Sequence, residues 1–206
     1  MSFTNYTTFV AALTSFMDNT DADAQVDTFI DLAHARLNRL VRLDEMETMA
    51  TASTVGGNRW VTKPTGYMGM RRLKITLGTG RVLGLDYVTP GKMDDTPEYN
   101  NQGAPAVFTI VSNRIRLGPI PNGVFELEMA YYANVAVLSG SNTTNIFLAQ
   151  IPDLLLYACM TEAGIWMRDP EMRTYWSAGF NDRYEETKTN DEMGRFPAGQ
   201  LAMSVV

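Results

Sequence analysis

Chemically reactive side chains are scarce in this chain of 206 residues. It contains one histidine and one cysteine, and charged residues make up 19% of it, below the roughly 25% usual in soluble proteins. A zinc site needs three or four His, Cys or carboxylate ligands, and a Ser–His–Asp triad needs a nucleophile presented by a motif such as GxSxG. Neither pattern is present. We therefore expect no catalytic residue, no metal and no cofactor, and we interpret the chain as a non-enzyme.

The lone histidine and the lone cysteine both fall in stretches with helical spacing. His34 lies away from the apolar stripe of its segment, which predicts a solvated or interface side chain. Cys159 lies inside an apolar run, which predicts a buried and inert thiol. A single cysteine excludes an internal disulfide and fits a reducing compartment.

Long apolar runs and excess positive charge are also missing. No run reaches the about 18 apolar residues that cross a bilayer, and the N-terminus has no basic region or apolar core of a signal peptide. We therefore expect no membrane segment. The net charge of -6 and the pI near 4.8 disfavour sequence-independent DNA binding, which needs clustered Lys and Arg.

Two further patterns resemble catalytic features. The glycines of segment 78–84 superficially resemble a dinucleotide loop, but their spacing is wrong and no βαβ pattern surrounds them, so we predict a turn between strands. Carboxylate pairs could serve a glycosidase, which needs two carboxyl groups flanking the bond. The candidate pairs are Asp94 with Asp95, Glu185 with Glu186, and Glu162 with Asp169.

Apolar residues at helical spacing predict four helices, over about 4–17, 21–43, 152–167 and 170–188. In the second, aspartates come early and arginines late, an order that complements the helix dipole. The third is apolar nearly all round, so it must be covered on more than one side. The fourth begins at Asp169-Pro170, an N-cap followed by proline. The residues predicted to be core are Phe29, Ile30, Leu37, Leu40, Leu155, Trp176 and Phe180.

Between the second and third helices, residues 44–136 alternate short apolar runs with glycine and proline. This pattern predicts a β-rich insertion, with strands over 71–77, 106–111, 114–117 and 124–133. Ser112-Asn113 is expected to form a tight hairpin turn, and the polar segment 90–103 is expected to be a loop. The fold class is therefore α+β, a helical bundle from N- and C-terminal helices with a central β-rich insertion.

We interpret residues 1–190 as a single domain and residues 191–206 as an extended C-terminal tail. The tail keeps several apolar residues that it cannot bury within a helix of its own. We expect these residues to anchor the tail on a partner; they are Phe196, Pro197, Leu201 and Met203.

Several segments occur in an order shared with a known family. An Arg- and Leu-rich helix comes first, a β-rich middle follows, and apolar helices come last; the segments are 29–39, 104–110, 115–121, 131–132, 138–139, 152–157, 162–163, 166–170 and 176. In this order and spacing the chain resembles the head-to-tail adaptor proteins of tailed bacteriophages, also called head completion or connector proteins. The resemblance covers roughly residues 1–190.

The resemblance implies a structural virion protein without catalytic residues. Members of such a family form a ring, most often of twelve subunits, between the portal protein and the tail, stopper or nozzle proteins at the head–tail interface. From the acidic composition we further expect DNA to pass through the lumen without specific binding, and we expect the four anchors of the C-terminal segment to bind the portal protein. A ring needs two different apolar patches on each subunit, which suits a helix that is apolar on more than one side.

Two other functions are compatible with the residues alone. One is a virion-associated peptidoglycan hydrolase that uses one of the carboxylate pairs. The other is a monomeric α+β binding module. The mass in solution distinguishes a ring from a monomeric module. A hydrolase would lose its peptidoglycan-hydrolysing activity when a residue such as Glu162 is replaced by glutamine.

Overall fold

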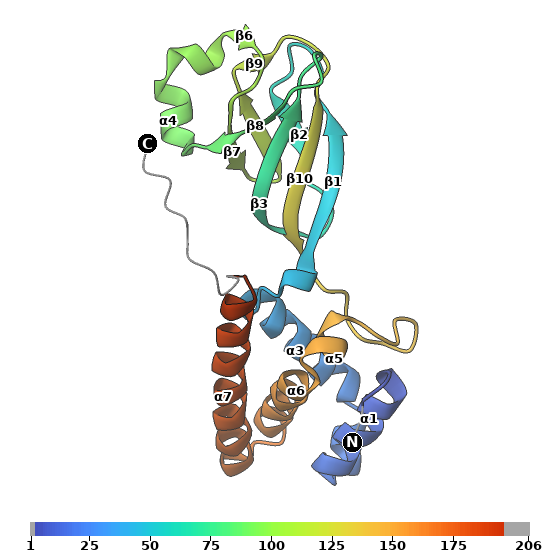
Figure 1. Cartoon of the computed structure of the whole chain (residues 1–206). Coiled ribbons are helices and arrows are strands. Elements are labelled where there is room, and N and C mark those ends of the chain that lie inside the picture. The colour runs from blue at the N-terminus through green and yellow to red at the C-terminus, as the bar shows by residue number, and fades with distance from the viewer. Residues whose placement is uncertain (1–2, 196–206) are drawn as a thin grey trace. The chain divides into compact units, whose positions relative to one another are not determined.

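A computed structural model describes residues 3–195 of the chain, with side chains as far as Asp191. The described residues form two compact units (Figure 1). Segments before Met46 and after Asn134 build a helical unit, and Met46–Asn134 builds a β unit. The predicted α+β class, with a β-rich insertion between N- and C-terminal helices, is confirmed. The sequence predicted one domain over 1–190, and the described residues divide into these two compact units.

The helical unit contains α1 (Tyr6–Met17), α2 (Thr20–Asp23), α3 (Val26–Leu40), α5 (Ile146–Gln150), α6 (Pro152–Trp166) and α7 (Pro170–Arg195). The helix predicted over 21–43 is divided into α2 and α3, because Gln25 leaves helical geometry between them (φ -108°, ψ 4°). It also ends early, at Leu40, where Val41 turns to an extended conformation. The side chain of Asn19 caps α2 by accepting hydrogen bonds from the backbone of Asp21 and Ala22.

The helix α6 is the centre of the helical unit. It contacts α1, α3, α5 and α7, and buried residues occur around most of its circumference, as predicted from its composition. Gly164 allows α7 to approach closely, because a Cβ at this position would lie 2.9 Å from the backbone nitrogen of Arg173. The side chain of Asp169 caps α7 through hydrogen bonds from the backbone N–H of Glu171 and Met172, at 3.0 and 2.9 Å. This confirms the predicted N-cap.

Five of the predicted core residues are buried, and the prediction was wrong for two. Phe29, Ile30, Leu37, Leu155 and Phe180 are at most 2% exposed. Leu40 is 42% exposed, because α3 ends there and no helix covers its side chain completely. Trp176 is half-buried and contacts Phe16 and Tyr157 edge-on or tilted at the surface.

The helix α7 is longer than predicted. It continues to Arg195, past the predicted end at 188 and into the first residues of the predicted tail. The last turns of α7 have no apolar stripe, so periodicity could not reveal them. The sequence nevertheless allows a helix to continue past 188, because the first residue that strongly opposes a helix is Pro197. The four predicted anchors, Phe196, Pro197, Leu201 and Met203, lie outside the described residues.

The β unit contains two four-stranded sheets and one two-stranded sheet. The first has the order β1 (Glu47–Ser53), β10 (Glu126–Ala133), β3 (Tyr67–Thr76), β4 (Val82–Gly84), with antiparallel pairs throughout. The second has the order β2 (Trp60–Thr62), β8 (Arg114–Gly118), β7 (Val107–Val111), β5 (Asp86–Tyr87). The third pairs β6 (Gln102–Gly103) with β9 (Ile120–Pro121), and a 3-10 turn, η1 (Asp44–Met46), precedes β1. Side chains of both larger sheets, among them Leu73, Ile115 and Leu127, share one core.

The predicted strands and turns of the β unit are present at β3, β7, β8 and β10. Ser112-Asn113 joins β7 to β8, with Ser112 at φ 52°, and the glycine-rich segment 78–84 contains the turn between β3 and β4. The loop predicted over 90–103 was wrong. It contains α4 (Pro90–Asp95) and a 3-10 helix η2 (Pro97–Asn100), because Thr89 caps α4 and Met93 is buried against Val88 and Val107.

Candidate interaction site

The lone histidine is buried, which corrects the solvated or interface position predicted for it. His34 is 0% exposed, and its Nε2 accepts a hydrogen bond from the backbone N–H of Leu138 at 3.4 Å. The side-chain amide of Asn145 lies 3.3 Å from the same nitrogen, and the Phe147 ring lies 5.3 Å from the imidazole. The segment that enters the helical unit after the β unit therefore covers a second side of α3. Asn38, one turn later, exchanges two hydrogen bonds with the backbone of Val135.

Because His34 is buried, we expect the folded protein to lose stability as the pH falls. The pKa of His34 is lowered to about 4 because burial disfavours the charged imidazolium. In the unfolded chain the pKa is about 6.5, so between these values the unfolded state binds more protons. The free energy of unfolding should therefore fall by about 2 kcal/mol between pH 7 and pH 5. Urea titrations followed by circular dichroism at both pH values measure this difference.

The control for this prediction is His34→Gln, which keeps a polar side chain but does not titrate. This variant is less stable at pH 7, yet it should lack most of the loss between pH 7 and pH 5. An equal loss in the two proteins would show that other groups cause the pH dependence.

The lone cysteine has the setting that the sequence predicted. Cys159 is 1% exposed within α6, and burial raises the pKa of its thiol. A buried thiol with a raised pKa is unreactive, because the thiolate is the nucleophile. Within the described residues, no group of three or more His, Cys, Asp or Glu side chains is arranged to hold a metal ion.

Three carboxylates of the candidate pairs form structural contacts in the folded chain. Glu162 lies 4.0 Å from Arg36, whose guanidinium stacks 3.9 Å above the ring of Phe180. Asp169 caps α7, as described above. Asp94 forms an ion pair with Arg116.

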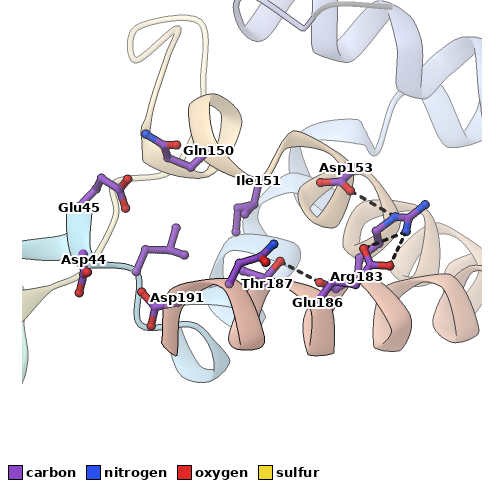
Figure 2. A pocket seen from close by; sticks show the side chains of 11 residues that line it. Asp44, Glu45, Gln150, Ile151, Asp153, Arg183, Glu186, Thr187 and Asp191 are labelled. Atoms are coloured by element: carbon purple, nitrogen blue, oxygen red, sulfur yellow. Dashed lines mark hydrogen bonds and ion pairs between the residues drawn. The ribbon is translucent and has the colours of Figure 1, made fainter. Parts of the chain in front are cut away.

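A cavity of about 380 Å³ opens in the helical unit between residues 43–45, which follow α3, the junction of α5 and α6, and the C-terminal half of α7 (Figure 2). At one end, the Arg183 guanidinium lies between two carboxylates, 3.3 Å from Asp153 and 3.0 Å from Glu186. The remaining charged side chains in the lining are all acidic: Asp44, Glu45 and Asp191. The cavity therefore has an excess of negative charge.

A smaller groove of about 230 Å³ lies beside this cavity and is more apolar. Its lining includes Leu40, Val41 and Leu43 from the end of α3, with Tyr184 and Lys188 from α7. The hydroxyl of Tyr184 lies 3.4 Å from the carbonyl oxygen of Leu40, to which it donates a hydrogen bond. The groove and the cavity share Leu43, Thr187 and Asp191, so both lie at the C-terminal part of α7, where the chain continues toward the predicted tail.

A second surface of the helical unit is aromatic. Phe16 of α1 and Tyr175 of α7 are 47% and 70% exposed, and both contact the half-buried ring of Trp176. We call Phe16, Tyr175 and Trp176 the aromatic strip. Aromatic side chains are enriched in the cores of protein–protein interfaces.

Charge is divided unevenly between the two units. Met46–Asn134 contains nine Lys and Arg and seven Asp and Glu, whereas the rest of the chain contains eight and sixteen. The acidic character of the protein therefore belongs to the helical unit and the segments that flank it. The β unit is slightly basic.

The exposed aromatic strip and the open acidic cavity are surfaces that suit contacts with other proteins. A family model described as SU10 adaptor protein matches residues 4–202, so the chain belongs to this family. This confirms the predicted resemblance: the protein is a bacteriophage adaptor, a structural component of the virion, and its family implies contacts with other head and tail proteins. No curated protein matches the chain significantly. None of the described helices is both long enough and apolar enough to cross a membrane.

Proposed function

We propose that the protein forms a ring between the portal and the tail of the phage, at the head–tail interface. The proposed ring has twelve subunits, the number most often found in the family that the chain resembles. The observation that carries this proposal is the family match over residues 4–202. Exposed apolar surface supports it, because each subunit of a ring needs two different patches that meet on neighbouring copies. The aromatic strip is a candidate for one of these patches.

In this proposal DNA passes through the lumen of the ring, during packaging and ejection, without specific binding. The division of charge supports this role. The helical unit has an excess of carboxylates, and a surface of negative charge repels the phosphates of DNA. DNA would therefore slide past such a surface.

The ring attaches to the portal through the C-terminal residues, with Phe196, Pro197, Leu201 and Met203 as anchors. Support comes from the sequence, because these four apolar side chains stand in a C-terminal stretch without helical or strand period, which cannot bury them in an element of its own. The opposite side of the ring contacts the tail, stopper or nozzle protein.

Mass measurement tests this proposal. Light scattering coupled to size-exclusion chromatography should give about twelve times the chain mass of 22.9 kDa for the protein alone, or that mass in addition to the mass of the portal once portal is added. Elution as a monomer under both conditions would contradict the ring. Replacing Tyr175 and Trp176 of the aromatic strip by serine tests whether this surface contributes to the ring.

A further inference from the structure

The first large sheet of the β unit has two open edges. Its order is β1-β10-β3-β4, so β1 and β4 each pair with one strand only, within the described residues. An open edge carries a row of backbone N–H and C=O groups that can pair with a strand from another chain. Native proteins usually protect such edges with Lys, Pro or a bulge.

The β1 edge has few of these protections. Over its seven residues, Glu47–Ser53, it contains no proline and no lysine, and its register with β10 is regular from end to end. Its one charged residue, Glu47, is neutralised by Arg71 at 3.2 Å. Met49 is 59% exposed on this strand. The edge is therefore suited to accept another strand.

The β4 edge is short, but its side chains alternate between exposed and core-facing positions as those of β1 do. Val82 is 53% exposed, whereas Leu83 packs against the core of the β unit. On β1 the same alternation occurs, since Met49 is exposed and Ala50 packs against that core. If β4 of one copy lay beside β1 of another, Val82 and Met49 would share the outer face.

We propose that β1 of one subunit pairs with β4 of the next, so that the first sheet continues from copy to copy around the ring. This inference rests on the proposed ring. Strand direction supports it: β1 and β4 are separated by two strands in an antiparallel sheet and run in opposite directions. Neighbours in a twelve-membered ring are related by a small rotation, so β1 and the next β4 run antiparallel, the commoner arrangement.

The occupant of the β1 edge is a second copy of this chain because the two open edges belong to one sheet and complement each other. A contact between two different edges is heterologous, and heterologous contacts are the kind that generate rings. Pairing covers both edges and both exposed apolar residues at once. A strand from a foreign protein on β1 would leave β4 uncovered.

Cysteine cross-linking tests this pairing in the assembled full-length protein. The variant with Met49→Cys and Val82→Cys should give a ladder of disulfide-linked dimers, trimers and larger species on a non-reducing gel. Thr51→Cys with Val82→Cys tests the neighbouring register. Within one subunit β1 and β4 lie about 14 Å apart, three strand spacings, too far for a disulfide. The native Cys159 is buried and does not interfere.

Further variants and outcomes distinguish the proposed pairing from other contacts of the β1 edge. The single variants Met49→Cys and Val82→Cys should not cross-link, and dimers from either alone would indicate contacts between like edges and overturn the proposal. A cross-link of Met49→Cys with Met203→Cys in place of Val82→Cys would assign the β1 edge to the C-terminal segment and also overturn it. Intact rings without a ladder in either register would overturn the pairing and leave the ring standing. A protein that stays monomeric with portal would overturn both.

Discussion

Replacing Leu37 by alanine should lower the free energy of unfolding by about 2–5 kcal/mol. Leu37 is 0% exposed in α3, which packs against the central helix α6. Truncation to alanine removes apolar contacts and leaves a cavity that the surrounding helices fill only in part. Urea denaturation followed by circular dichroism at the helical band measures the change.

The matched control is Leu32→Ala, on the same helix. Leu32 is 48% exposed, so the same substitution removes little buried surface and should change stability by about 0.5 kcal/mol or less. Equal effects of the two variants would contradict the assignment of α3 as a core helix. A loss of stability in Leu37→Ala but not in Leu32→Ala would support this assignment.

Removing the C-terminal residues after Arg195 should abolish binding to purified portal while leaving the subunit folded. Each apolar anchor contributes roughly 1.5–3 kcal/mol when buried, and repetition around a ring multiplies the effect through avidity. The cut after Arg195 preserves α7, which a cut after Lys188 would shorten. Co-sedimentation with portal measures binding, and circular dichroism checks the fold.

A full-length variant refines this test. Serine at Phe196, Pro197, Leu201 and Met203 should lose portal binding as the truncation does, whereas serine at Ala198 and Ala202 should keep it. If the truncated chain binds portal as well as the full chain, the C-terminal residues have no part in attachment.

The long helices were predictable because their burial follows a period. In α3 the stripe that includes Phe29, Ile30 and Leu37 marks the buried face, and in β10 the alternation of Leu127, Met129 and Tyr131 marks a half-buried strand. The strand β1 was not predicted. Its inward side chains are Thr48, Ala50 and Ala52, which are too small to produce an apolar alternation in the sequence. Its strand conformation depends on pairing with β10, which lies far along the chain.

The candidate site was less predictable than the fold because it depends on distant segments. His34 is buried by Leu138 and Asn145, which follow it by more than a hundred residues, so no local pattern could indicate its position. The cavity is lined by residues 43–45, by the junction of α5 and α6, and by the C-terminal half of α7. By contrast, the family could be predicted, because the order of segments along the chain carries the resemblance.

Electron cryomicroscopy of purified virions tests the central claim most directly. Reconstruction of the portal vertex should show a ring built from this chain between portal and tail, with helical and β units that fit Figure 1 separately. Each copy should contact the portal through residues that follow Arg195. Virions in which the density between portal and tail fits neither unit, or which lack the chain, would contradict its role as a head-to-tail adaptor.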